Sequence, residues 1–535
     1  MTPFANWTFF GLLLLYAVLP VLVLGLLGKA SAKRCFVLTL FILGVIFSSN
    51  ESAVLRIGGL GWPEMLGPKF LRPWHQQDGV LQVGPLYVFL LSALYLWGLC
   101  FAWLRWKSKR LLPLAILLGL APILCSRLLP HFSLIHTFGF IGISYVTFRA
   151  LDVIFSIHDG AVKMLRPGEL FAFLFFFPTV SSGPIDRLRR FSQDWSRERT
   201  RAEFLDDLDF ALHRVFRGFL YKFILAALID QHLRQPLLKT SGIWGSVGMM
   251  YVYTAYLFFD FAGYSAFAVG LSRFLGVKSP ENFATPFLAR NIRDFWARWH
   301  MSLSFWLRDH VHMRFQLAAM KGKWFRGKQT ASYVAVFLTF GIMGVWHGLA
   351  PHYLLYGLYH AILVSGYDVF FRWNKTAKFW PDGPWWRALN TGITFHIVAF
   401  GMLLFSGRLI PAPAPAHDEQ VERADCNSVE GFVWQRDKRE GGILVDLYVD
   451  YGWIARTQTD LVRYDLLEKG YGNGHHGYYF ELPKWVRNGA PHIVEIRVVG
   501  TNRAVGKPKV VACPEPEGTP VIPFPGDKQT TRGEL

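Results

Sequence analysis

Apolar stretches alternate with short polar segments along the first 410 residues, and each approaches the roughly 20 residues that a helix needs to cross a bilayer. We interpret ten of them as crossings: 8–28, 35–49, 84–104, 111–128, 135–156, 208–231, 246–272, 331–349, 353–371 and 389–408. The stretch 171–182 (FAFLFFFPTVSS) is shorter and contains Pro178, which favours a re-entrant segment buried in protein. The pattern predicts an all-α polytopic membrane domain over 1–410, with a polar insertion near 50–83.

The pattern changes after Arg408, where a Pro/Ala-rich segment leads into short runs that alternate with period two. These runs are 431–436, 443–450, 478–482 and 492–499, and clusters of Gly, Asn and Asp separate them. We therefore expect a linker over 411–425 and a small all-β, sandwich-like accessory domain over 426–535.

Composition supports the membrane assignment. The chain is 52% hydrophobic and 16% aromatic, with a mean hydropathy of +0.25, which is too apolar for a soluble protein of this size. Its formal charge of +18 is concentrated in the segments between spans. This distribution follows the positive-inside rule, and no nucleic-acid-binding motif accompanies it, so we expect membrane lipid and no nucleic acid as a partner.

The basic segments also predict an orientation in the cell (inner) membrane. They follow the first and third spans and recur at 187–201, 273–328 and 372–387, and we assign them to the cytoplasm. The N-terminus then lies outside. Ten crossings return the C-terminal domain to the outside, in the periplasm, whereas a miscount by one would reverse its side.

Two cysteines, Cys426 and Cys513, flank the β-region. They are able to form a disulfide if that domain lies outside the cytoplasm and remain free thiols if it lies inside. The pair His310 and His312 lacks the Cys, Asp or Glu partners that would complete a metal site, so we expect no metal.

His347 is the strongest candidate for chemistry because it ends an otherwise apolar span within GVWHG (344–348), next to Trp346 and Gly348. An ionisable residue in a membrane costs about 3 kcal/mol and so marks a functional candidate. A neutral imidazole accepts a proton from a hydroxyl that attacks an ester or thioester, as acyl transfer requires. The alternative is a structural histidine satisfied by a backbone carbonyl.

Three further segments contain candidate residues. WARWHMSLS (296–304) contains His300 and Ser302, although its tryptophans and arginines also fit an interfacial amphipathic helix. FFDFAGYS (258–265) contains Asp260 within a span, where a structural role, such as pairing with an arginine or capping a helix, is favoured. FPTVSSGPIDR (177–187) contains Ser182 and Gly183 in a break that lines a tunnel or forms a simple turn.

Seven segments taken together resemble one family. In chain order they are GISYVTFR (142–149), FPTVSSGPIDR, FFDFAGYS, PENF (280–283), WARWHMSLSFWLRDHVHMR (296–314), GVWHG and YGLYH (356–360). They resemble the membrane-bound O-acyltransferase (MBOAT) superfamily, and within it the membrane proteins of teichoic-acid D-alanylation (Dlt) systems. The resemblance covers roughly residues 5–410 and leaves the insertion and the β-domain outside it.

The resemblance implies a helical bundle with a funnel from each face and a thin floor between them. It implies His347 and His300 as the catalytic pair, with Trp346, Gly348, Ser302, Asp260, Ser182 and Gly183 as candidates for the substrate tunnel. It also implies that no cofactor is bound and that the donor is a phosphopantetheine thioester on a carrier protein. Candidate contacts with that carrier, whose acidic surface suits basic side chains, are Arg293, Arg298, Arg308 and Arg314.

The sequence therefore predicts a membrane acyltransferase that moves an acyl group, foremost D-alanine, from a cytoplasmic carrier thioester to a hydroxyl of an extracytoplasmic acceptor. That acceptor is a teichoic-acid-like or other cell-envelope glycan, or a partner acyltransferase. An O-acetyltransferase of the alginate or exopolysaccharide type is the alternative enzyme. A transporter or non-catalytic scaffold is the alternative from another class.

Overall fold

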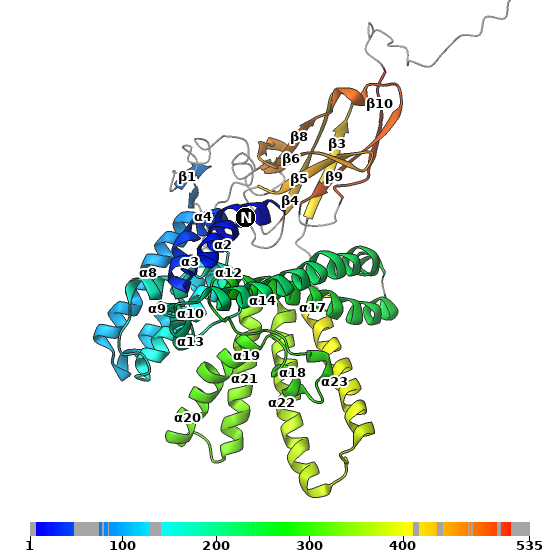
Figure 1. Cartoon of the computed structure of the whole chain (residues 1–535). Helices are drawn as coiled ribbons and strands as arrows, with labels where there is room; N and C mark the ends of the chain where they lie inside the picture. Colours follow the sequence, from blue (N-terminus) through cyan, green and yellow to red (C-terminus); the bar gives the residue numbers. More distant parts are fainter. Residues whose placement is uncertain are drawn as a thin grey trace, which may run out of the picture. The chain divides into compact units, whose positions relative to one another are not determined.

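A computed structural model of the chain describes residues 7–47, 74–77, 80–83, 85–128, 141–240, 242–409, 417–435, 442–468, 471, 474–499 and 504–514. The chain divides into two compact units, Met1–Ile410 and Pro411–Leu535. The first unit is helical and the second is built from strands (Figure 1). The fold class predicted from the sequence is confirmed.

Seven helical segments of the described residues are long and apolar enough to cross a membrane. The first runs Phe9–Leu26 through α1 (Trp7–Leu13), a π-helical turn and α2 (Leu19–Leu26). The others are α8 (Pro85–Trp106), α9 (Leu112–Leu128), α17 (Gly242–Phe274), α21 (Lys328–His347), α22 (Pro351–Ala377) and α23 (Pro384–Phe405).

Seven of the ten predicted crossings meet this criterion, and the other three do not meet it within the described residues. The stretch 35–49 is divided between α3 (Ala32–Leu38) and α4 (Leu40–Phe47), because the Thr39 hydroxyl donates to carbonyls of the preceding turn. The stretch 135–156 contributes α10 (Ile143–His158), and 129–140 lies outside the described residues. The stretch 208–231 belongs to a charged helical run that begins with α14 (Arg201–Phe219). Counting spans therefore does not fix the side of the C-terminus.

The predicted re-entrant stretch forms two short helices, α11 (Pro167–Leu174) and α12 (Phe177–Val180). Arg149 of α10 is almost fully buried beside them. Its guanidinium donates to the carbonyl oxygens of Phe173 at 3.0 Å and Thr179 at 2.9 Å. These bonds satisfy carbonyls that a broken helix leaves free, which explains how an irregular backbone is tolerated here.

Five short elements follow α17: the 3₁₀-helical η7 (Pro286–Leu288), α18 (Ile292–Trp296), α19 (Met301–Leu307), the π-helical η8 (Arg308–His312) and α20 (Met313–Lys321). Figure 1 shows α21, α22 and α23 side by side beyond them. Glycines permit the close contact of α21 with α22: a Cβ at Gly357 would lie 2.4 Å from the Phe340 carbonyl oxygen. The last turn of α21 is thereby held against α22.

The second unit contains two four-stranded antiparallel sheets with the orders β3-β4-β8-β7 and β10-β9-β5-β6. Its strands are β3 (His417–Ala424), β4 (Ser428–Gln435), β5 (Leu444–Val449), β6 (Gly452–Gln458), β7 (Leu461–Val462), β8 (His475–Glu481), β9 (Pro491–Val498) and β10 (Lys509–Ala512). Residues from both sheets share one apolar core, including Val433, Phe480, Leu447 and Ile496, so the sheets form a sandwich.

Two boundary predictions change. The linker predicted over 411–425 is wrong for its second part, because β3 occupies His417–Ala424 as an edge strand of the sandwich. The predicted insertion near 50–83 ends in a hairpin, β1 (Trp74–Gln77) with β2 (Val80–Val83), and its first part, 50–73, lies outside the described residues. Cys426 and Cys513 are joined by a disulfide across the sandwich, with Cα atoms 5.4 Å apart.

Candidate active site

His347 is the last residue of α21, and its half-buried ring faces aromatic side chains of two neighbouring helices. The ring centroid lies 4.8 Å from that of Phe405, 6.0 Å from that of Tyr353 and 6.4 Å from that of Tyr356. Within the described residues, neither ring nitrogen has a hydrogen-bond partner. The alternative of a histidine satisfied by a backbone carbonyl therefore finds no support in this part of the chain.

His300 immediately precedes α19 and has a left-handed backbone, with φ of 44° and ψ of 50°. A non-glycine residue in this conformation costs about 1–3 kcal/mol, and such strain clusters at functional sites. The side chain is buried, and Nε2 has no partner among the residues that the structure describes. Burial, with a smaller effect of His347, lowers the pKa of His300, so its imidazole is neutral at pH 7.

The Trp346 ring lies close to the rings of both histidines. Its ring centroid lies 4.6 Å from that of His347 and 6.2 Å from that of His300. Its indole Nε1 is buried without a partner in the described part of the chain, like His300 Nε2. The structure thus brings together three predicted site residues, and two of their buried nitrogens have no hydrogen-bond partner among the described residues.

A buried hydrogen-bond network fixes the strained turn at His300. Asn282 accepts from the Met301 amide through its carbonyl at 2.9 Å and from the Ser302 hydroxyl through Oδ1 at 2.6 Å. The Ser302 hydroxyl in turn accepts the Ile185 amide at 3.0 Å, and Asn282 donates to Ser265 of α17 at 3.1 Å. Three elements therefore meet at this turn, and Ser302 serves as one of its structural links.

The other tunnel candidates also make framework contacts. Tyr264 of α17 accepts the Ser182 amide at 3.1 Å, and the backbone of Gly183 has φ of 80°, where a Cβ would meet the Tyr145 ring at 2.9 Å. Asp260 forms an ion pair with Lys222 rather than with an arginine. These contacts agree with the turn and with the structural role for Asp260 that the sequence analysis left open.

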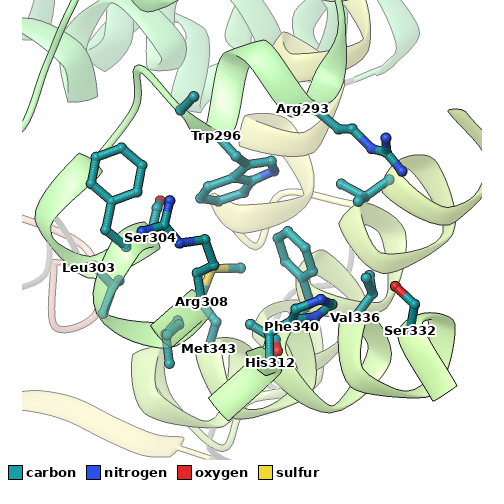
Figure 2. A pocket seen from close by; sticks show the side chains of 15 residues that line it. Arg293, Trp296, Leu303, Ser304, Arg308, His312, Ser332, Val336, Phe340 and Met343 are labelled. Atoms are coloured by element: carbon teal, nitrogen blue, oxygen red, sulfur yellow. The ribbon is translucent and has the colours of Figure 1, made fainter. Parts of the chain in front are cut away.

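A cavity of about 370 Å³ lies between the α18, α19 and η8 segment and helices α21 and α22. Its walls are mainly apolar, with a few polar side chains among them. The lining residues are Arg293, Trp296, Ala297, Leu303, Ser304, Phe305, Leu307, Arg308, His312, Ser332, Val336, Thr339, Phe340, Met343 and Val364. Figure 2 shows the rings of Trp296 and Phe340 within it, and their centroids are 5.1 Å apart.

Two of the segments that line the cavity also carry the histidines, although neither His300 nor His347 lines it. Met343 precedes His347 by one helical turn on α21, and Trp296 precedes His300 by four residues. The Trp296 indole donates to Nδ1 of the fully buried His360 at 3.3 Å.

Comparison with known proteins agrees with this geometry. The model of the membrane-bound O-acyltransferase family matches residues 155–405. The teichoic acid D-alanyltransferase of Bacillus subtilis is 41% identical over 412 residues, which cover 76% of this chain and 98% of that protein. The chain belongs to the membrane-bound O-acyltransferase family. It is an acyltransferase, and the transporter or scaffold alternative is set aside.

Two further relatives of this MBOAT enzyme are similar to it over shorter parts of the chain. The teichoic acid D-alanyltransferase of Streptococcus thermophilus is 43% identical over 286 residues, covering 51% of this chain and 69% of that protein. A probable alginate O-acetylase of Pseudomonas syringae is 30% identical over 318 residues and 57% of each chain. The Bacillus subtilis match leaves about a quarter of this chain without a counterpart, which is the size of the second unit.

The four predicted carrier contacts of the MBOAT enzyme are divided by the structure. Arg293 and Arg308 line the cavity, with 45% and 55% of their side chains exposed. Arg298 and Arg314 do not line the cavity. All four pair with carboxylates, respectively Asp368, Asp309, Asp294 and Asp159. They do not form one continuous patch of free positive charge.

One polar cluster of the MBOAT enzyme was not predicted. Arg187 donates to Asp152 at 2.8 Å and to Asp309 at 3.0 Å, and His310 lies 2.9 Å from Asp152. Burial lowers the pKa of His310, against the raising effect of Asp152. The cluster ties α10 and the segment after α12 to η8, beside the cavity. Its signal in the sequence was the presence of Arg187 and His310 in the quoted motifs, but spacing alone did not reveal their partner.

Proposed function

We propose that this enzyme transfers a D-alanyl group from a carrier-protein thioester, arriving from the cytoplasm, to a hydroxyl of an extracytoplasmic cell-envelope polymer. The observation that carries the proposal is the match to a teichoic acid D-alanyltransferase over 98% of that protein. The acceptor is then of the teichoic-acid type, reached directly or through a partner acyltransferase. No cofactor is bound in this proposal, because the donor brings its own thioester.

His347 is the general base in this reaction. Its neutral imidazole takes the proton of the acceptor hydroxyl while the hydroxyl oxygen attacks the thioester carbonyl carbon. The C–S bond then breaks, and the imidazolium returns the proton to the departing sulfur. No described residue forms a hydrogen bond with its ring, which supports this role because a general base needs a free acceptor nitrogen.

His300 and Trp346 stabilise the oxyanion in this proposal. His300 Nε2 and Trp346 Nε1 are buried donors without partners in the described part of the molecule. A buried donor left unpaired costs about 1–3 kcal/mol, so these two groups are expected to find a ligand. Preorganised donors of this kind reduce the barrier at a developing negative charge, typically by about 3–4 kcal/mol for each donor.

The cavity between α19 and α21 suits the pantetheine arm of a carrier. Such an arm is slender, carries amides and begins at a phosphate. The apolar walls suit the slender arm, and the guanidinium groups of Arg293 and Arg308 suit its phosphate. Arg293 already pairs with Asp368, and Arg308 pairs with Asp309. A bound phosphate would therefore contact guanidinium groups that keep these carboxylate partners.

The disulfide supports a periplasmic β-domain, since such bonds persist outside the reducing cytoplasm. With the N-terminus outside as well, the number of crossings is even, so an odd number of segments crosses in addition to the seven candidates of the described residues. Among those residues, the helical run from Arg201 to Lys239 is the longest one remaining. We assign one further crossing to it and place the enzyme in the cell (inner) membrane.

The central test uses purified protein in liposomes, carrier protein loaded with labelled D-alanine and an extracted acceptor polymer. His347→Gln should lower transfer by about 10²–10⁴-fold, while labelled carrier still binds. His396→Gln is the matched control, because His396 is an exposed histidine on the neighbouring span α23. Transfer by His347→Gln at the wild-type rate would refute the assignment.

O-acetyl transfer is a second candidate, favoured by the match to a probable alginate O-acetylase. The two reactions are distinguished by donor. Wild-type protein should label the acceptor from D-alanyl carrier and not from an acetylated donor. The reverse preference would move the enzyme to the O-acetylation branch and leave the role of His347 intact.

A further inference from the structure

The β-domain presents an ordered polar and aromatic face on its β10-β9-β5-β6 sheet. Tyr448 of β5 lies directly between Trp453 of β6 and Glu495 of β9. In the adjacent row, Asp446 lies between Arg456 and Arg497. Residues directly opposite each other share one face of a sheet, and Val445, Leu447 and Val449 of β5 occupy the buried face. The two rows therefore form the outer face of this sheet.

A β-bulge creates this arrangement. The register of β5 with β6 shifts between Leu447 and Tyr448, so Trp453 and Arg456 point to the same side although three positions separate them. Trp453 remains 56% exposed, and Tyr448 is half-buried. A tryptophan that stays exposed on a sheet face offers a ligand a large apolar ring together with a polar N–H group.

The polar groups of this face hold one another in place. Arg456 donates to both Asp446 carboxylate oxygens, at 2.7 and 2.9 Å, and Asp446 is almost fully buried. Arg497 donates to both Glu495 oxygens at 2.9 Å and stacks over the Tyr448 ring at 4.6 Å. The Tyr448 ring is thus fixed before any ligand arrives, which reduces the entropy lost on binding.

The charge balance of the face indicates the kind of ligand. Arg456 and Arg497 are each neutralised by a carboxylate, so the two rows carry no net charge. An anionic lipid surface or a bare polyphosphate would find no uncompensated cation here. A sugar ring fits better, since its C–H face stacks on an aromatic ring and its hydroxyls hydrogen-bond to carboxylates and guanidinium groups.

We propose that the Trp453–Tyr448 face binds a sugar ring of the cell-envelope glycan and so holds the acceptor polymer near the enzyme. This inference rests on the proposed function for the identity of the polymer. The match to Bacillus subtilis D-alanyltransferase leaves a portion of this chain the size of the β-domain unmatched, so the domain adds a property beyond the shared acyltransferase unit.

The test is binding by the full chain in nanodiscs of zwitterionic lipid, without acyl donor. The probes are an immobilised panel of bacterial-surface oligosaccharides and, separately, glycerol phosphate oligomers. Trp453→Ala should weaken oligosaccharide binding by about tenfold or more, and Trp453→Phe should retain most of it. Tyr479→Ala is the matched control, because Tyr479 is 44% exposed on β8 of the other sheet.

Selective loss in Trp453→Ala, with the disulfide and melting temperature unchanged, supports the proposal. Equal binding by wild type and Trp453→Ala overturns it, as does binding of glycerol phosphate oligomers alone or of the lipid surface alone. The assay contains no donor, so failure of D-alanyl transfer does not affect it. Conversely, normal transfer to a short soluble acceptor by a chain that binds no oligosaccharide would refute only this inference.

Discussion

Gly344→Ala tests whether the close contact of α21 with α22 sets the position of His347. Gly344 precedes His347 by one turn, and a Cβ there would lie 2.6 Å from the Tyr353 carbonyl oxygen and 3.3 Å from its carbonyl carbon. Backbone atoms cannot rotate away, so the two helices must part. An ordinary contact needs about 3.4 Å or more, which implies a separation of roughly 0.8 Å.

This displacement should reduce catalysis more than it reduces folding. Tyr353 and Tyr356, which face the His347 ring, both lie on α22 and would move away with it. A misplacement of about 1 Å at a reacting group costs about 10²-fold in rate, whereas overpacking of a helix contact costs about 1–3 kcal/mol in stability. We therefore expect transfer to fall roughly 100-fold in protein that remains folded.

The assay is the initial rate of labelled D-alanyl transfer in liposomes, normalised to folded protein by size-exclusion chromatography and thermal unfolding. Gly341→Ala is the control, because Gly341 lies on the same helix and an added Cβ meets no atom within 4 Å. Its rate should stay within about twofold of wild type, because no contact is displaced. An unchanged rate in Gly344→Ala, or an equal loss in both variants, would refute the reasoning.

Three further predictions concern stability. Arg149→Met should destabilise the helical unit by about 3 kcal/mol or more, since it leaves the carbonyls of α11 and α12 unsatisfied, and thermal unfolding in detergent measures this. Arg456 lowers the pKa of Asp446, so the β-domain should lose stability as pH falls through this depressed pKa, and melting between pH 6 and 3 should be less pH-dependent in Asp446→Asn. Cys426→Ser removes a disulfide between residues 87 positions apart and should lower the free energy of unfolding by roughly 2–4 kcal/mol. Reductant should lower the stability of the wild type by a similar amount and leave the stability of the variant unchanged.

The sequence predicted the parts of the fold that depend on local pattern. Period two after residue 431 and long apolar runs in α8, α17 and α22 correspond to strands and helices, because burial on one face or contact with lipid imposes these patterns directly. The break within the predicted crossing 35–49 has a local origin as well. Apolar content alone did not reveal the break at Thr39, where a hydroxyl competes for carbonyls of the helix.

Long-range polar partners were beyond the reach of the sequence. Asp152 and His310 are 158 residues apart, and Lys222 pairs with Asp260 across 38 residues. Nothing in the spacing of either pair specifies a contact, because the packing of separate helices brings them together. The motifs identified His300 and His347, but the proximity of both rings to Trp346 required the fold.

The contrast between satisfied and unsatisfied groups gives the best physical argument for the active site. Around the strained turn, Asn282, Ser302 and Tyr264 all have hydrogen-bond partners, as buried polar groups in a membrane protein should. Among the described residues, His300 Nε2 and Trp346 Nε1 have none, although both are buried. In the proposed reaction these two nitrogens contact a group that arrives with the substrate, and His300 does so in the tautomer that carries its proton on Nε2. The carbonyl oxygen of a thioester, which gains negative charge as the acceptor attacks, is such a group.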